Sequence, residues 1–143
     1  MKVKKYENKY FSSLYEIEKE AFSDFWSEKG MREEVSLSQA HYYLAEENGE
    51  ILGYAGFWLI IDEAEIMKIA VKKSERGKGI GNSLLIAMLE DAAMMGAKTI
   101  LLEVREGNTP ARLLYEKHGF FSYTIREKYY EGKENAVLYK KNL

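Results

Sequence analysis

The stretch RGKGIGN occupies positions 76–82, between a run of strand-forming residues and a segment of helical periodicity. Its glycines let the backbone approach an anion closely, and the first N–H groups of the following helix point toward that anion with the positive end of the helix dipole. The spacing departs from the dinucleotide pattern G-x-G-x-x-G, because residue 82 is asparagine, and it lacks the GK[ST] ending of a nucleotide-triphosphate loop. The stretch therefore predicts a pyrophosphate site that serves neither NAD nor ATP. The alternative is a solvated turn whose glycines merely start a helix.

Basic side chains are concentrated around this loop. Five of them fall between positions 68 and 78, and we expect them to surround it: Lys68, Lys72, Lys73, Arg76 and Lys78. Coenzyme A carries both a pyrophosphate and a ribose 3'-phosphate, so a cluster of cations suits that ligand electrostatically.

The segments on either side of the loop predict a strand, a crossover helix and a second strand. A strand is expected over 65–71, and the apolar spacing after the loop predicts a helix that stops at Gly96. The near-continuous apolar run 99–104 is typical of a strand that is covered on both faces and lies centrally in a sheet. A strand, helix and strand in this order indicate a parallel pair, with 65–71 beside 99–104.

The remaining segments complete an α/β chain. Helices are expected over 12–22, after Trp26 with Ser27 as N-cap, and from Thr109-Pro110 to Gly119. Strands are expected over 42–46, 50–60, 120–127 and 135–140, with a hairpin turn at Asn48-Gly49 and a connection at Glu131-Gly132. Their order is ααβββαβαββ, which predicts a mixed sheet with helices on both faces.

Composition limits the possible functions. The 143 residues, with 46% hydrophobic content and no Gly/Ser/Pro-rich linker, predict a single domain over 1–143. There is no cysteine, and neither His41 nor His118 has ligand spacing around it, so thiol catalysis and a metal site are not expected. Twenty-one basic and 23 acidic side chains leave a net charge of -2, which does not favour nucleic acid. No leader-like or membrane-spanning apolar segment is evident, so a cytoplasmic location is expected.

The sequence resembles the GCN5-related N-acetyltransferase (GNAT) superfamily over nearly the whole chain. Its motif [Q/R]-x-x-G-x-[G/A] is matched in full from Arg76 to Gly81. The resemblance is closest to the RimI-type ribosomal-protein-alanine acetyltransferases, through IAV at 69–71, LEVR at 102–105, LYE at 114–116, Gly119-Phe120 and REKYY at 126–130. It implies a GNAT fold, an enzyme that uses acetyl-coenzyme A, and two central parallel strands that splay apart to admit the pantetheine arm.

The resemblance also implies a cofactor site. Strand residues would bind pantetheine through their backbone, the glycine loop would hold the pyrophosphate, and Asn108 would contact the pantetheine arm. The residues concerned are Ile69, Ala70, Val71, Arg76, Gly77, Lys78, Gly79, Ile80, Gly81, Asn82 and Asn108.

Acetyl transfer to an amine needs one group that takes a proton from the amine and one that protonates the departing thiolate. Glu103, near the end of its strand, is the candidate base, and we expect burial to raise its pKa. The alternative is a strand-end ion pair with Arg105 or a lysine. Tyr115 is the candidate acid, although a tyrosine on a helix is usually part of the core. His118 ranks below Tyr115, because a histidine in the last turn of a helix usually serves the helix dipole.

An N-terminal α-amine loses its proton more readily than lysine does, so a lone carboxylate base suits it better. The RimI-type resemblance implies the N-terminal alanine of a small-subunit ribosomal protein, with Trp26, Tyr129 and Tyr130 as substrate contacts or else ordinary core and hairpin residues. Departures from the family pattern are Phe25, Lys68 and residues 134–136. Two alternatives stay open: a small-molecule amine such as a polyamine or an amino acid derivative, and a coenzyme-binding module without activity.

Overall fold

The computed structural model describes residues 1–130 and 132–143. Within these residues the chain forms one mixed sheet of seven strands and four α-helices. The elements are β1 (Lys2–Lys5), α1 (Phe11–Ala21), α2 (Glu28–Ser36), β2 (Ala40–Glu47), β3 (Glu50–Ile60), β4 (Glu63–Val71), α3 (Ile80–Met94), β5 (Thr99–Arg105), α4 (Thr109–Lys117), β6 (Phe121–Tyr130) and β7 (Glu134–Asn142), and the strand order is β1-β2-β3-β4-β5-β7-β6.

The order expected from the sequence is confirmed, with β1 as an additional first strand. β1 pairs antiparallel with β2, from Lys2 opposite Glu46 to Lys5 opposite Tyr43. Its sequence, KVKK, has one apolar side chain, Val3, which packs against the core. A short, lysine-rich strand at a sheet edge discourages pairing with other chains, and the same composition gives little strand signal in sequence.

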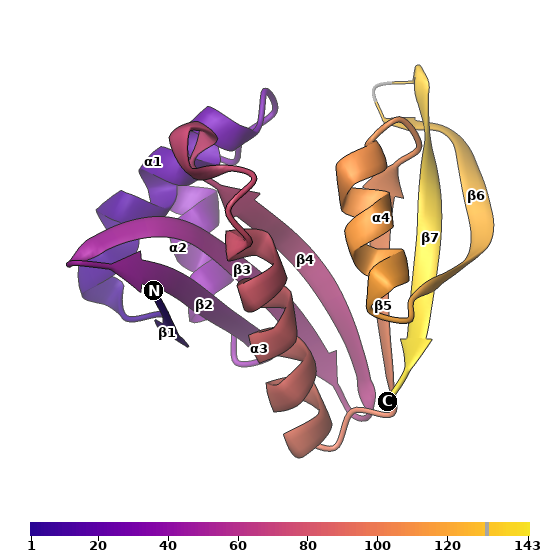
Figure 1. The fold of residues 1–143 in the computed structure, drawn as a ribbon, viewed down its shortest axis with the longest axis horizontal. Coiled ribbons are helices and arrows are strands. Elements are labelled where there is room, and N and C mark those ends of the chain that lie inside the picture. Colours follow the sequence, from indigo (N-terminus) through magenta and orange to yellow (C-terminus); the bar gives the residue numbers. More distant parts are fainter. Residues whose placement is uncertain (131) are drawn as a thin grey trace.

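Helices cover both faces of the sheet, as predicted. In Figure 1, α3 lies on one face of β2 to β4, and α1 and α2 lie behind the same strands. Because side chains alternate along a strand, Tyr42 and Leu44 of β2 join the core under α1 and α2, and Tyr43 and Ala45 join the core under α3. The sheet therefore separates two apolar clusters.

The two central parallel strands diverge. β4 and β5 pair only from Glu63 opposite Thr99 to Glu65 opposite Leu101, and beyond this point they separate into the open wedge of Figure 1. β4 stays paired with β3 as far as Val71, and β5 stays paired with β7 as far as Arg105. Each strand is thus supported from outside, and backbone groups on the inner edges are available to a ligand.

Two local expectations need correction. β5 is covered on one face only: Ile100, Leu102 and Val104 are buried and the alternate residues are partly exposed, because α1 and α2 stop short of β5. The N-cap of α4 is Asn108, whose side chain accepts from the N–H of Ala111, rather than Thr109. An asparagine oxygen reaches that N–H as well as a threonine oxygen does, so the sequence allowed either.

Other local expectations hold. Ser27 caps α2 by accepting from the N–H of Gly30, and Asn48 and Gly49 both have positive φ, as a tight hairpin turn needs. The expected connection at Glu131-Gly132 lies partly outside the described residues, since Glu131 is not described. Within the described residues, none of the helices is long and apolar enough to cross a membrane.

Candidate active site

Two adjoining hollows occupy the wedge. The first, here called the glycine-loop cleft, has a volume of about 590 Å³ and lies between the end of β4, the loop at 72–79 and the starts of α3 and α4. The second, here called the inter-strand cavity, has a volume of about 340 Å³ and lies between β4, β5 and α4. Both are lined by Phe22, Ile69, Asn108, Ala111 and Leu114, so they form one continuous site.

The glycine-loop cleft gathers nearly all the residues expected to bind the cofactor. Gly77 and Gly79 have φ of +80° and +85°, and Gly79 is the N-cap of α3. An added Cβ at either position would meet nothing within 4 Å, so the need for glycine is conformational. Of the eleven expected cofactor residues only Lys78 does not line the cleft, since its exposed side chain pairs with Glu75 at 2.8 Å.

The expected ring of five cations is not what the structure contains. Lys68 lies on the α1 face of β4, where its ammonium binds Glu18 at 2.7 Å, because side chains alternate along the strand. Lys72 pairs with Glu50 at 2.7 Å, and the Nε of Arg76 donates to the carbonyl of Val71. Of the five cations, including Lys73, only Arg76 lines the cleft, where backbone N–H groups at the start of α3 also favour an anion.

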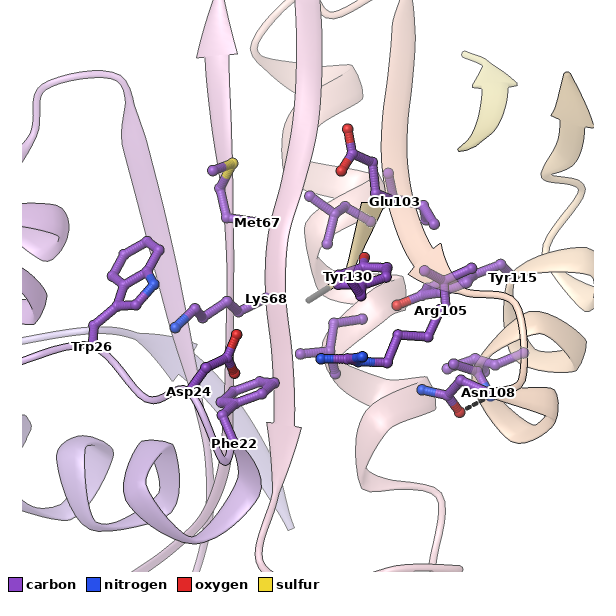
Figure 2. A pocket seen from close by; sticks show the side chains of 16 residues that line it. Phe22, Asp24, Trp26, Met67, Lys68, Glu103, Arg105, Asn108, Tyr115 and Tyr130 are labelled. Carbon is purple, nitrogen blue, oxygen red and sulfur yellow. Dashed lines mark hydrogen bonds between the residues drawn. The ribbon is translucent and has the colours of Figure 1, made fainter. Parts of the chain in front are cut away.

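The inter-strand cavity brings together both candidate catalytic residues and two of the three expected substrate contacts. Figure 2 shows Glu103 on β5, Tyr115 on α4 and Tyr130 at one side of this cavity, and Trp26 across from them beyond β4. Tyr129 does not line it: its side chain is 49% exposed and packs edge-on against Tyr130 at 5.1 Å between ring centroids. Successive residues of a strand point to opposite faces, so adjacent tyrosines could not both face the cavity.

Glu103 is less buried than the sequence suggested. Its side chain is 23% exposed, and Oε1 lies 3.0 Å from Nη1 of Arg126 on β6. The ion-pair alternative therefore holds with a partner other than Arg105, which pairs with Glu134 and lies over the ring of Tyr130. A carboxylate that faces a cavity and keeps an exposed partner is still accessible to an incoming amine.

Tyr115 is both a core residue and a cavity residue. Its side chain is buried, and its ring packs against Phe120 and Tyr139 at 5.7 and 6.3 Å between centroids. Burial raises the pKa of Tyr115 to about 12, so the phenol stays protonated at neutral pH and can donate its proton. His118, the weaker candidate, instead contacts Asn82, with its Nε2 2.6 Å from the amide Oδ1.

A buried network at the cavity wall was not foreseen. Glu18, at an apolar position of the α1 stripe, is fully buried and accepts from Lys68, Tyr54 and the N–H of Trp26. Burial lowers the pKa of Lys68, and its hydrogen bonds with Glu18 oppose that shift. An acidic residue on an otherwise apolar helix stripe was the one sequence signal for this network.

A second carboxylate also lies near Glu103. Burial, followed by the neighbouring Glu103 and Glu63, raises the pKa of Glu65 above its ordinary value. Glu65 ends the paired part of β4, where the wedge begins, but it does not line the inter-strand cavity.

Comparison with known proteins identifies the family. Residues 11–120 match the model of the Acetyltransferase (GNAT) family. The chain belongs to this family. A [ribosomal protein bS18]-alanine N-acetyltransferase from Haemophilus influenzae is 38% identical over 132 residues, covering 90% of this chain and 89% of that protein. The crystal structure of the ribosomal-protein-S18-alanine N-acetyltransferase from Escherichia coli superposes with a TM-score of 0.92 at 30% identity, covering 99% of this chain and 92% of that one.

As a GNAT family member, the protein is an acetyl-coenzyme A-dependent N-acetyltransferase. The site fits this co-substrate: the cleft has room at Gly77 and Gly79, the inner edge of β4 is free of a strand partner beyond Glu65, and the cleft opens into the cavity with Glu103. Across residues 1–130 and 132–143, no group of three or more metal-ligating side chains is placed to hold an ion.

Proposed function

We propose that the protein, as one domain over residues 1–143, acetylates the N-terminal α-amine of a protein chain, and specifically the N-terminal alanine of a small-subunit ribosomal protein. One observation carries the proposal: the inter-strand cavity, with a carboxylate and a phenol in its walls, shares five lining residues with the glycine-loop cleft. A cofactor in the cleft and an amine in the cavity would therefore meet. The names of the relatives at 33 to 38% identity supply the substrate class.

The two catalytic roles follow from the chemistry of the side chains. Acetyl-coenzyme A supplies an acetyl thioester. Glu103 accepts a proton from the attacking ammonium, directly or through water, because its carboxylate lines the cavity. Tyr115 holds its proton at the cavity wall, since burial raises its pKa to about 12, and gives that proton to the departing thiolate.

The cofactor residues divide by position. The backbone of Ile69, Ala70 and Val71 offers strand-like hydrogen bonds along the inner edge of β4, and residues 76–82 place glycine and helix N–H groups around the pyrophosphate. Asn108 lines both hollows, so its amide can contact the arm that joins them. Lys78 contributes only long-range charge, because its side chain points into solvent.

The cavity itself supports a peptide acceptor. Aromatic side chains stand at its two sides, Trp26 from the segment between α1 and α2 and Tyr130 from the end of β6, and these rings can contact the residues that follow the reacting amine. An α-amine is also partly unprotonated near neutral pH, which reduces the demand on a carboxylate base.

A competition assay tests the proposal. A peptide that begins with alanine and contains an internal lysine, the same peptide with a blocked N-terminus, and spermidine are each supplied with acetyl-coenzyme A. Released thiol is followed with a thiol reagent, to which the chain contributes nothing because it has no cysteine. We expect turnover of the free peptide alone, with mass spectrometry placing the acetyl group on its N-terminus. Faster turnover of spermidine than of the peptide would refute it and favour a small-molecule acceptor.

A further inference from the structure

Trp26 is fixed at three points, although it lies in the segment between α1 and α2. Its backbone N–H donates to Oε2 of Glu18 at 2.9 Å, and its carbonyl accepts from the hydroxyl of Tyr15 at 2.9 Å. Its ring lies under the ammonium of Lys68, 3.8 Å from the centroid. A residue outside regular structure is thus held by two hydrogen bonds and a cation–π contact.

Glu18 is the centre of this arrangement. The carboxylate is fully buried, and both of its oxygens accept from Lys68, at 2.8 and 2.7 Å, in addition to the bonds from Tyr54 and Trp26. A buried carboxylate is costly unless it is paired and hydrogen-bonded throughout, and an apolar pair of similar volume often serves stability as well. Stability alone is therefore a weak reason for a charged pair at this position.

Lys68 connects this buried pair to the cavity. Its side chain is 11% exposed and lines the inter-strand cavity, and its ammonium also lies 4.8 Å from the ring centroid of Phe22, which lines both hollows. Figure 2 shows Lys68 leaving β4 on the side of Trp26, with Glu103 on the opposite side of the cavity. The ammonium of Lys68 therefore contacts the segment 22–27 at both Phe22 and Trp26 and helps to hold it against β4.

We propose that Lys68, held by Glu18, is a positioning residue for the acceptor: it fixes residues 22–27 so that Trp26 forms a rigid cavity wall across from Glu103. The identity of the acceptor as a peptide rests on the proposed function, but the positioning of the segment does not. A preformed wall lowers the ordering cost of binding, so its loss weakens acceptor binding more than it slows the chemical step.

Kinetics with three lysine variants test the role. Lys68→Met removes the cation and keeps the length of the side chain, and we expect the KM of the alanine peptide to rise about tenfold, with kcat and the KM of acetyl-coenzyme A within about twofold of wild type. Lys68→Arg, which keeps the charge and can stack on Trp26, should recover most of the peptide affinity. Lys98→Met is the matched control, because Lys98 is 80% exposed and pairs with Asp62 away from both hollows.

Hydrogen exchange gives a second measurement that needs no acceptor. In Lys68→Met we expect faster exchange over residues 22–27, including the backbone N–H of Trp26, which donates a hydrogen bond to Glu18 in the wild type. Exchange over β2 and β3 should be unchanged. If Lys68→Met does not fold, Glu18→Gln/Lys68→Met removes both charges together and is held to the same expectations. Unchanged exchange, or a parallel rise of both KM values, would overturn the proposal. If wild type turns over no peptide, the proposed function fails and the exchange result alone decides the role of Lys68.

Discussion

Glu103 is the residue on which the chemical step depends most directly. Its carboxylate lines the inter-strand cavity near the end of β5 and pairs with Arg126. We expect Glu103→Gln to lower kcat at neutral pH about 10²-fold or more, because the amide cannot accept the proton of the amine. The affinity for acetyl-coenzyme A, measured by calorimetry, should stay unchanged, since no cleft residue is altered. Glu106→Gln, in the loop after β5 and outside both hollows, is the control, and an unchanged kcat in Glu103→Gln would remove this role.

Tyr115 has a pH signature of its own. Because burial raises its pKa to about 12, the phenol is protonated over the whole practical range, and its loss of a proton cannot lower kcat below about pH 10. We expect Tyr115→Phe to reduce kcat with little change in acetyl-coenzyme A binding, and wild-type kcat to show no downward limb between pH 7 and about 10. A downward limb in that range that disappears in Tyr115→Phe would contradict the raised pKa, and an unchanged kcat in Tyr115→Phe would contradict the role as acid.

At the scale of elements, the turn from β4 into α3 depends on the left-handed conformation of Gly79. A Cβ there has open space but an unfavourable φ of +85°, so Gly79→Ala should cost about 1–2 kcal/mol in stability and distort the N–H groups at the start of α3. We expect a lower Tm and a higher KM for acetyl-coenzyme A. Gly49→Ala, with φ of +82° and equally open space at the β2–β3 turn, should lower Tm alike and leave that KM unchanged. Equal KM values in both variants would argue against the loop as the pyrophosphate site.

At the scale of the whole molecule, the sheet is two arms joined where β4 and β5 still pair. A ligand that fills the wedge contacts both arms and binds only the folded state, so acetyl-coenzyme A at 100 times its Kd should stabilise the fold by about 2.7 kcal/mol. We expect a rise in Tm and slower hydrogen exchange over residues 69–71 and 77–82, with no change at the β2–β3 turn. Stabilisation without protection of these residues would place the ligand elsewhere.

The candidate site was largely predictable where its features are local. Short sequence patterns indicated the glycine loop, the strand residues 69–71 that precede it, and the pair Glu103 and Tyr115. The structure places all of them around one continuous hollow. The positions of the Lys68 and Tyr129 side chains could not be predicted, because they depend on which face of its strand each side chain lies on. A shift of one residue in register reverses that face, and local composition does not fix register.

The sequence by itself determined the order of the elements after β1, the glycine loop before α3 and the parallel central pair, because helical period, strand alternation and glycine content can be read from neighbouring residues. Only the tertiary structure decided that Glu103 meets Arg126 and that Lys68 meets Glu18, fifty residues away in the chain. Such partners are determined by how helices and strands pack. A charge can be buried without a large loss of stability only where that packing places its counter-charge beside it.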